Sequence, residues 1–228
     1  DNAGPFEFVI PKDPEHFLSL THTRLEGCIE VTKGDAAFTA LAAADKVYPV
    51  NLFSQSIFKQ VEVELNGIQV GDLSTPTYAY KGYIETHCSY GKDAKDTHLK
   101  CSMYEKDTPG KEELVDDTNL GALARGKLIQ GKKFYFSNII HSDFFQSNKY
   151  LLPNIELKVK FIRNEDTFSL MAPAGTSCKI HIKNLKLSTR KIRIANEVLQ
   201  SLENTLKQVP ANYDLTQSKI KTFLIPSG

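Results

Sequence analysis

Between Val61 and Val70 the chain alternates apolar and charged or polar residues with a period of two. This period is typical of a β-strand with one face buried and the other in water. Asn66-Gly67 interrupts the alternation, and these residue types readily adopt the positive φ angles of a type I′ turn. The pattern therefore predicts a β-hairpin over Val61–Val70, and we expect the rest of the fold to be organised around it.

Helical spacing is found on both sides of this hairpin. Upstream, apolar residues between Leu52 and Phe58 recur as in a short helical turn. Downstream, Ser74-Thr75-Pro76 combines an N-cap residue with a first-turn proline. The residues that follow place four side chains on one helical face: Tyr80, Tyr83, Ile84 and His87. We expect a helix over Pro76–Tyr90, packed outside the sheets or at one end of them.

Alternating or β-rich runs elsewhere predict the remaining strands. They lie at Phe6–Ile10, Leu25–Val31, Lys133–Phe136, Ile155–Ile162, Phe168–Met171 and Lys179–Ile194. A bulge is expected in the last of these, near Asn184. With about eight strands and one or two short helices, the chain is predicted to be mainly β, a jelly-roll β-sandwich.

The remaining segments predict how the domain is bounded. Ala36–Lys46 is expected to be a loop, and the charged stretch Lys92–Leu120, with Pro109-Gly110, a long excursion outside the core. After residue 194 the period becomes helical, and an apolar stripe follows at Val198, Leu199, Leu202 and Leu206. We therefore expect residues 1–194 to form the jelly roll, and residues 195–228 to be a helix and linker.

An internal echo suggests that a second domain follows the linker. Phe6–Pro11 is FEFVIP, and Lys221–Pro226 is KTFLIP. A repeat separated by about one domain length is typical of tandem units. The chain is thus predicted to be the first half of a tandem, with 195–228 leading into the first strand of a second jelly roll.

Five segments occur in a fixed order along most of the chain: FEFVIP, VYPVNLFSQSIFKQVEVELNG, YAYKGYIETHCSYGKDAK, FYFSNIIHSDFFQSNKYLLPNIELKVKFIRNEDTFSLM and IKTFLIPSG. In this order they resemble the major capsid protein of Polinton (Maverick) elements and the related adintoviruses. The resemblance implies a double jelly roll, of which this chain is the N-terminal half. It also implies a full-length homotrimer that forms pseudo-hexagonal capsomers, contacts with other capsid proteins such as a penton, and a place in a virion capsid made inside the host cell.

Two stretches are candidate subunit or domain interfaces. Residues 144–152 are unusually apolar and aromatic for a loop, as interface anchors are; the alternative is that they plug the open end of the sandwich. The tail from Ile220 to Ile225 is the second, because a strand completed elsewhere would leave an unpaired edge. The candidate residues are Phe144, Phe145, Tyr150, Leu151, Leu152, Phe223 and Ile225.

Charge and composition limit the other function classes. With 28 basic and 27 acidic residues, no net field indicates nucleic acid. Basic residues on the last long strand either contact packaged DNA without specificity or form a wet face neutralised by acidic neighbours: Lys179, Lys183, Lys186, Arg190, Lys191 and Arg193. No apolar run reaches the length of a membrane span. The alternative function is a jelly-roll binding module of carbohydrate-binding or receptor-ligand type, although the chain lacks the tryptophan platforms usual in sugar-binding sandwiches.

Candidate chemistry is weak throughout the chain. His141-Ser142-Asp143 places a base near a carboxylate, but a turn capped by the aspartate explains it equally well. His87, Cys88, His98 and Cys101 are possible zinc ligands, yet two adjacent residues of one helix face different directions and can hardly bind one tetrahedral ion. We expect no catalytic residue, no cofactor and no metal.

The first prediction concerns the four cysteines, which show no disulfide-framework spacing. We expect all four to react as free thiols in the denatured protein, and metal analysis of purified protein to find no stoichiometric zinc. About one zinc per chain, lost in a Cys101→Ser variant, would overturn this expectation.

Overall fold

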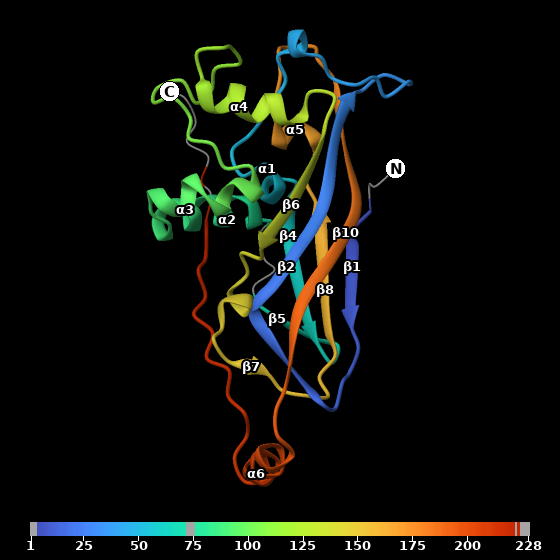
Figure 1. Cartoon of the computed structure of the whole chain (residues 1–228), viewed down its shortest axis with the longest axis vertical. Coiled ribbons are helices and arrows are strands. Elements are labelled where there is room, and N and C mark those ends of the chain that lie inside the picture. The colour runs from blue at the N-terminus through green and yellow to red at the C-terminus, as the bar shows by residue number, and fades with distance from the viewer. Residues whose placement is uncertain (1–3, 72–75, 222, 224–228) are drawn as a thin grey trace.

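The computed structural model describes residues 4–71, 76–221 and 223, and over this range the chain is mainly β (Figure 1). Two four-stranded antiparallel sheets form the body. The first has the order β1-β8-β4-β5, with β1 (Phe6–Ile10), β8 (Leu157–Arg163), β4 (Phe58–Leu65) and β5 (Ile68–Val70). The second has the order β10-β2-β6, with β7 beside β2, and contains β10 (Cys178–Arg193), β2 (His16–Lys33), β6 (Lys133–Ile139) and β7 (Tyr150–Leu151). A short pair joins β3 (Tyr48–Pro49) to β9 (Leu170–Met171).

The path of the chain is that of a jelly roll. It crosses from one sheet to the other after β1, β2, β5, β7 and β8, so strands distant in sequence become neighbours. This repeated crossing wraps the chain around a shared core, as in double-sheet jelly rolls. The predicted fold class, a jelly-roll sandwich with few helices, is confirmed.

The core lies between the two sheets, where alternate residues of each strand point inward. On β8, Leu157, Val159 and Phe161 are fully buried, and on the facing sheet so is Ile29. The rings of Phe58 and Phe161 pack at a centroid distance of 5.2 Å. Each such side chain contributes roughly 1.5–3 kcal/mol by burial, and together they hold the sheets face to face.

The predicted hairpin is confirmed in the first sheet. Asn66 and Gly67 have φ angles of 49° and 79°, as a two-residue hairpin turn requires. On the outward face of this sheet the charges pair across strands, with Lys160 Nζ 3.2 Å from Glu62 Oε2. The alternation thus separates an apolar interior from a charge-paired exterior.

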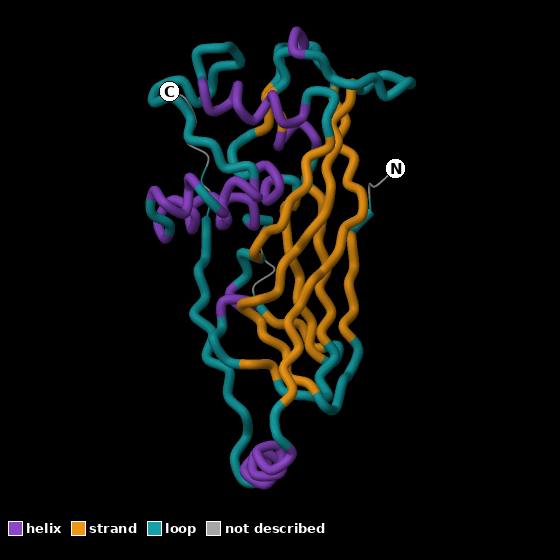
Figure 2. The backbone as a smooth tube through the Cα atoms, viewed as in Figure 1, coloured by secondary structure: helices purple, strands orange, loops and turns teal. Residues whose placement is uncertain are grey.

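The helices gather beside the upper half of the sandwich, except for one at the lower tip (Figures 1 and 2). They are α1 (Phe53–Ser56), α2 (Tyr78–Ser89), α3 (Lys92–Asp96), α4 (Leu120–Ile129), α5 (Asp166–Ser169) and, at the tip, α6 (Asn196–Leu206). Three 3-10 turns add η1 (Ala43–Asp45), η2 (His98–Ser102) and η3 (Asp143–Gln146). The helices predicted over Pro76–Tyr90 and after residue 194 correspond to α2 and α6, and the helical turn expected between Leu52 and Phe58 corresponds to α1. The other helices lack a strong period.

Three local predictions need correction. The strand expected to begin at Leu25 begins at His16. Its first half lacks a regular alternation of apolar and polar residues, but it is extended because it pairs with β10. Asp166–Ser169 is a helical turn, so only Leu170–Met171 of the expected strand is extended. The stretch Lys92–Leu120 is not wholly outside the core, since the side chain of Met103 is fully buried.

The bulge predicted in β10 is confirmed. Asn184 has a φ angle of 53°, and the pairing of β10 with β2 shifts between Lys183 and Lys186. The shift changes which residues face inward, from Ile182 above the bulge to Leu185 below it. The inner face of β10 therefore stays apolar on both sides of the bulge, although the alternation of apolar and polar residues is interrupted there.

Arg125 on α4 ties the excursion to the body of the protein. Its side chain is 1% exposed, and its Nε donates to the carbonyl of Pro49 at 2.7 Å. Its two terminal nitrogens reach the carbonyl of Glu105 at 2.8 Å and Asp107 Oδ1 at 2.7 Å. A buried guanidinium needs all of these partners to offset the loss of its hydration.

The second prediction follows from this cluster. Arg125→Met should lower the free energy of unfolding by about 3 kcal/mol, because Asp107 and two carbonyls lose their donor. Urea denaturation measures the loss. Lys127→Met, an exposed change on the same helix, is the control and should stay within about 0.5 kcal/mol of the parent protein. Equal stability of the two variants would contradict the role given to Arg125.

Candidate subunit interface

The structure divides the predicted interface residues into two groups. Phe144, Phe145 and Leu151 are buried in the main core, with 3%, 3% and 0% of their surface exposed. These three side chains are therefore part of the core. Tyr150 and Phe223 are 52% and 82% exposed, and Leu152 is half-buried. Ile225 lies outside the described residues. Only the exposed members present surface to another molecule.

The segment after α6 runs back along the sandwich toward α2 (Figure 1). The Tyr213 hydroxyl accepts from Leu152 N at 3.0 Å and donates to the carbonyl of Tyr150 at 3.0 Å. Lys149 Nζ donates to the carbonyl of Asn212 at 2.8 Å. The stretch predicted as an interface therefore binds a segment of its own chain.

A polar cluster lies under the inward face of α2, where η3 follows β6. Lys81 forms ion pairs with Asp143 and, at 3.7 Å, with Glu85. The Nδ1 atom of His141 is 2.7 Å from Glu85 Oε2, and the His141 side chain is 3% exposed. The cluster joins the helix to the sheet through charge, in addition to the core packing of Tyr78.

The cluster also fixes protonation states. Burial acts to raise the pKa of Glu85, but the hydrogen bond from His141 and the charges of His141 and Lys81 outweigh it and hold the pKa below its usual value. Nearby, burial raises the pKa of Tyr78, whose hydroxyl donates to Gln55 Oε1 at 2.7 Å. An ionised Glu85 and a neutral Tyr78 at neutral pH are the states that these partners require.

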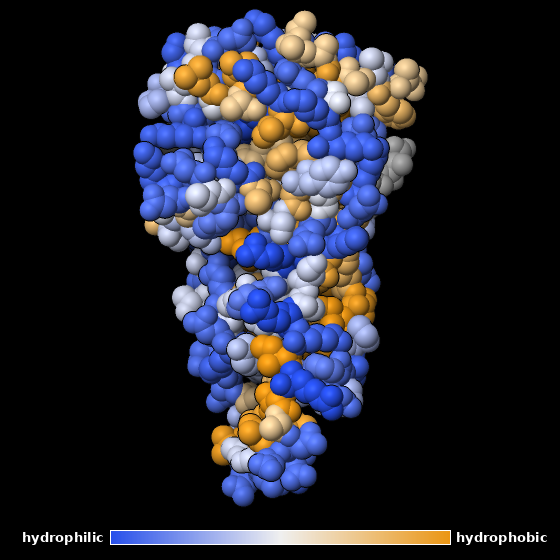
Figure 3. Space-filling view, in the orientation of Figure 1, coloured by the Kyte–Doolittle hydropathy of each residue, from blue (hydrophilic) through white to orange (hydrophobic). Residues whose placement is uncertain are grey.

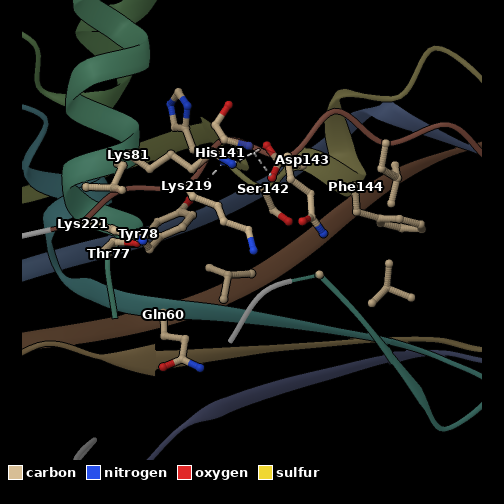
Figure 4. A pocket seen from close by; sticks show the side chains of 17 residues that line it. Gln60, Thr77, Tyr78, Lys81, His141, Ser142, Asp143, Phe144, Lys219 and Lys221 are labelled. Atoms are coloured by element: carbon tan, nitrogen blue, oxygen red, sulfur yellow. Dashed lines mark hydrogen bonds and ion pairs between the residues drawn. The ribbon is translucent and has the colours of Figure 1, made fainter. Parts of the chain in front are cut away.

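Beside the cluster is a hollow of about 160 Å³ between α2, η3 and the C-terminal segment (Figure 4). Ser218 N donates to Asp143 Oδ2 at 3.3 Å across it. Within the described part of the chain no hydrogen bond joins Ser142 to His141, whose Nδ1 is held by Glu85. The expected capping of the turn by Asp143 is wrong: its side chain binds Lys81 and Ser218 N, and within the described residues η3 has no side-chain cap.

The aromatic stripe predicted on α2 is present, and it faces outward. Tyr80, Tyr83 and Ile84 are 45%, 44% and 48% exposed. The inward-facing positions are occupied by members of the polar cluster, Lys81 and Glu85. Gly82 lets the helix approach the sheet closely, since a Cβ there would lie 3.2 Å from the His141 ring. We call Tyr80, Tyr83, Ile84 and His87 the α2 surface. A helix whose apolar stripe faces the solvent exposes area that a binding partner would cover.

Helix α6 also exposes apolar side chains, which Figure 3 shows at the lower tip of the molecule. None of its residues is buried. Val198 is 56% exposed, and Leu199, Leu202 and Leu206 are half-buried. The predicted stripe is therefore formed, but the described chain covers it only in part.

The possible zinc ligands do not converge. The His87 ring packs 4.3 Å from that of Tyr83, and Cys88 and Cys101 are exposed. Across the described ranges, no group of three or more His, Cys, Asp or Glu side chains could hold a metal ion. Over the same ranges, no helix has the length and apolar character needed to cross a membrane.

The basic residues of β10 are partly neutralised. Lys183 pairs with Glu30, Lys191 with Asp13 at 2.7 Å, and Arg193 with Glu15 at 3.4 Å. Among the residues that the structure describes, no ion pair is found for three exposed members of the strand: Lys179, Lys186 and Arg190. Three of the six basic residues on this strand thus have an acidic partner, and three have none among the described residues.

Comparison with known proteins adds few relatives. No family model matches the chain. It is 24% identical over 233 residues to an uncharacterized protein of Caenorhabditis elegans, covering 99% of this chain and 54% of that protein. Two solved structures are similar at 12% identity, each covering 93% of this chain and 43% of theirs: PBCV-1 VP54 fitted into a reconstruction of the virophage Sputnik, with a TM-score of 0.48, and the quasi-atomic model of the PBCV-1 capsid, with 0.49. The chain thus spans about half the length of the curated relative it matches.

The third prediction concerns the cluster under α2. Glu85→Gln should lower the free energy of unfolding by about 1–3 kcal/mol at neutral pH, because His141 loses its anionic partner and Lys81 loses one of its two. The pKa of Glu85 is lowered in the folded state, so its contribution is present above the unfolded pKa and lost as pH falls through the folded one.

Denaturation of the parent and variant across acidic and neutral pH checks this. The difference between them should shrink toward low pH, whereas the exposed control Glu203→Gln should change stability little at any pH. A difference that stays constant down to strongly acidic pH would argue against the ionised Glu85.

Proposed function

We propose that this chain is the N-terminal jelly roll of a capsid protein of the Polinton (Maverick) kind, a building block of a viral or virus-like shell. Residues 1–194 form the jelly roll, and residues 195–228 form the connection to a second one. The full-length protein associates as a trimer, meets penton-type proteins in the virion capsid, and is made inside the host cell.

The observation that carries the proposal is the exposed stripe of α6. Isolated helices shorter than about 12–15 residues are marginal in water and depend on packing of their apolar face. Helix α6 has 11 residues, none of them buried, and stands at the tip of the sandwich. Such a helix has its place in a larger assembly, where a neighbouring domain or subunit covers it.

Sequence and fold support the same function. The five segments that resemble the capsid family contain most of the first sheet, with β6 and β7 of the second, together with α1 and α2. A jelly-roll sandwich offers extended sheet surfaces, which suit a structural role. The exposed members of the candidate interface are Tyr150 and Phe223, and the unpaired cations of β10 are the candidate contacts to packaged DNA.

The fourth prediction compares this chain with one extended through a second jelly roll. The extended chain should form trimers, because each half contributes to a closed ring of three. The present chain should associate only weakly, since it lacks the surface that covers α6. Light scattering measures the mass of each, and electron microscopy shows whether particles form.

Two variants of the extended chain sharpen this experiment. Leu202→Asp places a charge in the α6 stripe and should abolish trimers, while Gln200→Asp, on an exposed position of the same helix, should leave them intact. An extended chain that stays monomeric at high concentration, with no particles at any salt concentration, would refute the capsid proposal. Binding of a polysaccharide by such a monomer would favour the binding-module alternative.

A further inference from the structure

A strongly acidic segment borders the α2 surface. Residues 105–117 contain six acidic and two basic side chains, a net charge of −4. Glu105 and Asp107 are neutralised by Lys100 and Arg125. No ion pair is found, within the described residues, for the others: Glu112, Glu113, Asp116 and Asp117. Glu112, Glu113 and Asp117 are exposed. We call residues 112–117 the acidic segment.

The stretch that leads into the acidic segment starts at the α2 surface, where the ring of Tyr104 lies 5.8 Å from that of His87. Consistent with this contact, burial and then the charges of Asp107 and Glu112 raise the pKa of Tyr83. Exposed apolar area bordered by negative charge fits a partner with an apolar centre and a positive rim. It repels nucleic acid and the anionic surface of a membrane.

Strand β10 of this protein provides a surface of that kind. Its 16 residues contain six basic and no acidic side chains. In the strand register Lys186 lies opposite Glu26, and Tyr135 lies opposite Cys28, two residues further along β2. Lys186 therefore shares the outer face of the second sheet with Tyr135, which is 71% exposed. Lys179 lies on the same face, opposite Thr32. The outer face of this sheet thus combines unpaired cations with an exposed aromatic ring.

We propose that the α2 surface and the acidic segment of one copy dock onto the outer face of β10 in a second copy of this chain. This deepens the proposed assembly function and rests on it. The helices project to one side of the sandwich, whereas β10 runs down the other side toward α6 (Figure 1). The two surfaces are different, so the contact is head-to-tail, and a docked pair keeps one free surface of each kind for further copies.

Charge reversal tests this contact with the chain as it stands. Glu112→Lys/Glu113→Lys takes the net charge of the acidic segment from −4 to 0, and Lys186→Glu/Arg190→Glu takes that of β10 from +6 to +2. Each double variant loses attraction between its own copies and should self-associate at least tenfold more weakly than the parent at low salt. An equimolar mixture should recover association, because each variant then offers the surface that the other lacks.

Sedimentation velocity at increasing concentration measures the association, with circular dichroism to confirm folding. Lys59→Glu/Lys207→Glu changes the net charge as much as the β10 variant, on exposed positions elsewhere, and should associate like the parent. Raising the salt should weaken the parent and the rescued mixture alike, because exposed charges are screened.

The outcomes separate this contact from the proposed function. If the extended chain forms trimers and particles but none of these reversals changes association, the contact is wrong and the capsid role stands. If the mixture stays as weak as its components, the head-to-tail pairing is likewise overturned. If Lys186→Glu/Arg190→Glu instead reduces only binding of double-stranded DNA, and reversal of the acidic segment has no effect, β10 serves the packaged genome rather than a second copy.

Discussion

The pairing of β2 with three other strands is the constraint on which most of this structure depends. Its 18 residues bond β10 along one edge, and β6 and β7 along the other. Inward residues such as Ile29 face the buried positions of β8, so the same strand also holds the second sheet against the first. The helices beside the sandwich are placed by this frame, because α1 and α2 contact the region where β6 ends.

Buried and exposed polar side chains have different roles in this protein. Arg125, Glu85 and His141 are buried or nearly so, and each has partners that satisfy its charge or hydrogen-bonding groups. They add ionic contacts to α4 and α2, which also bury Ile129 and Tyr78 in the core. On the surface, the cross-strand pairs of the first sheet keep its exterior wet, while the α2 surface and α6 stay apolar. Exposed apolar side chains are thus found on α2 and α6 as well as on the sheets, where Ile68 and Tyr135 are 73% and 71% exposed.

The local period of the sequence was enough to predict the hairpin, the bulge at Asn184 and the helices α2 and α6, because in each a regular pattern coincides with turn or cap chemistry. It did not reveal α4, because apolar and small residues occur on all faces of that helix and form no stripe. Nor could it give the direction that the stripe of α2 faces. Spacing shows which residues share a helical face, but His141 and Asp143, some sixty positions away, decide which face turns inward.

For the candidate interface, the sequence could identify apolar residues but not their exposure. Phe144 and Phe145 have the composition of anchors, yet η3 turns them into the core, and Tyr213 covers the neighbouring backbone. The exposed cations of β10 could be predicted as a group. Which of them keep their charge depends on Glu30, Asp13 and Glu15, whose register with β10 is a property of the folded sheet.

The ionic seating of α2 also limits how that helix can turn about its own axis. Apolar packing tolerates small rotations, since one methyl group replaces another at little cost. The pairs from Lys81 and Glu85 to Asp143 and His141 are satisfied at one rotation only, and the close approach at Gly82 leaves no room for sliding. Tyr80 and Tyr83 are therefore presented at a set angle before any partner arrives, so a partner finds a template already in place.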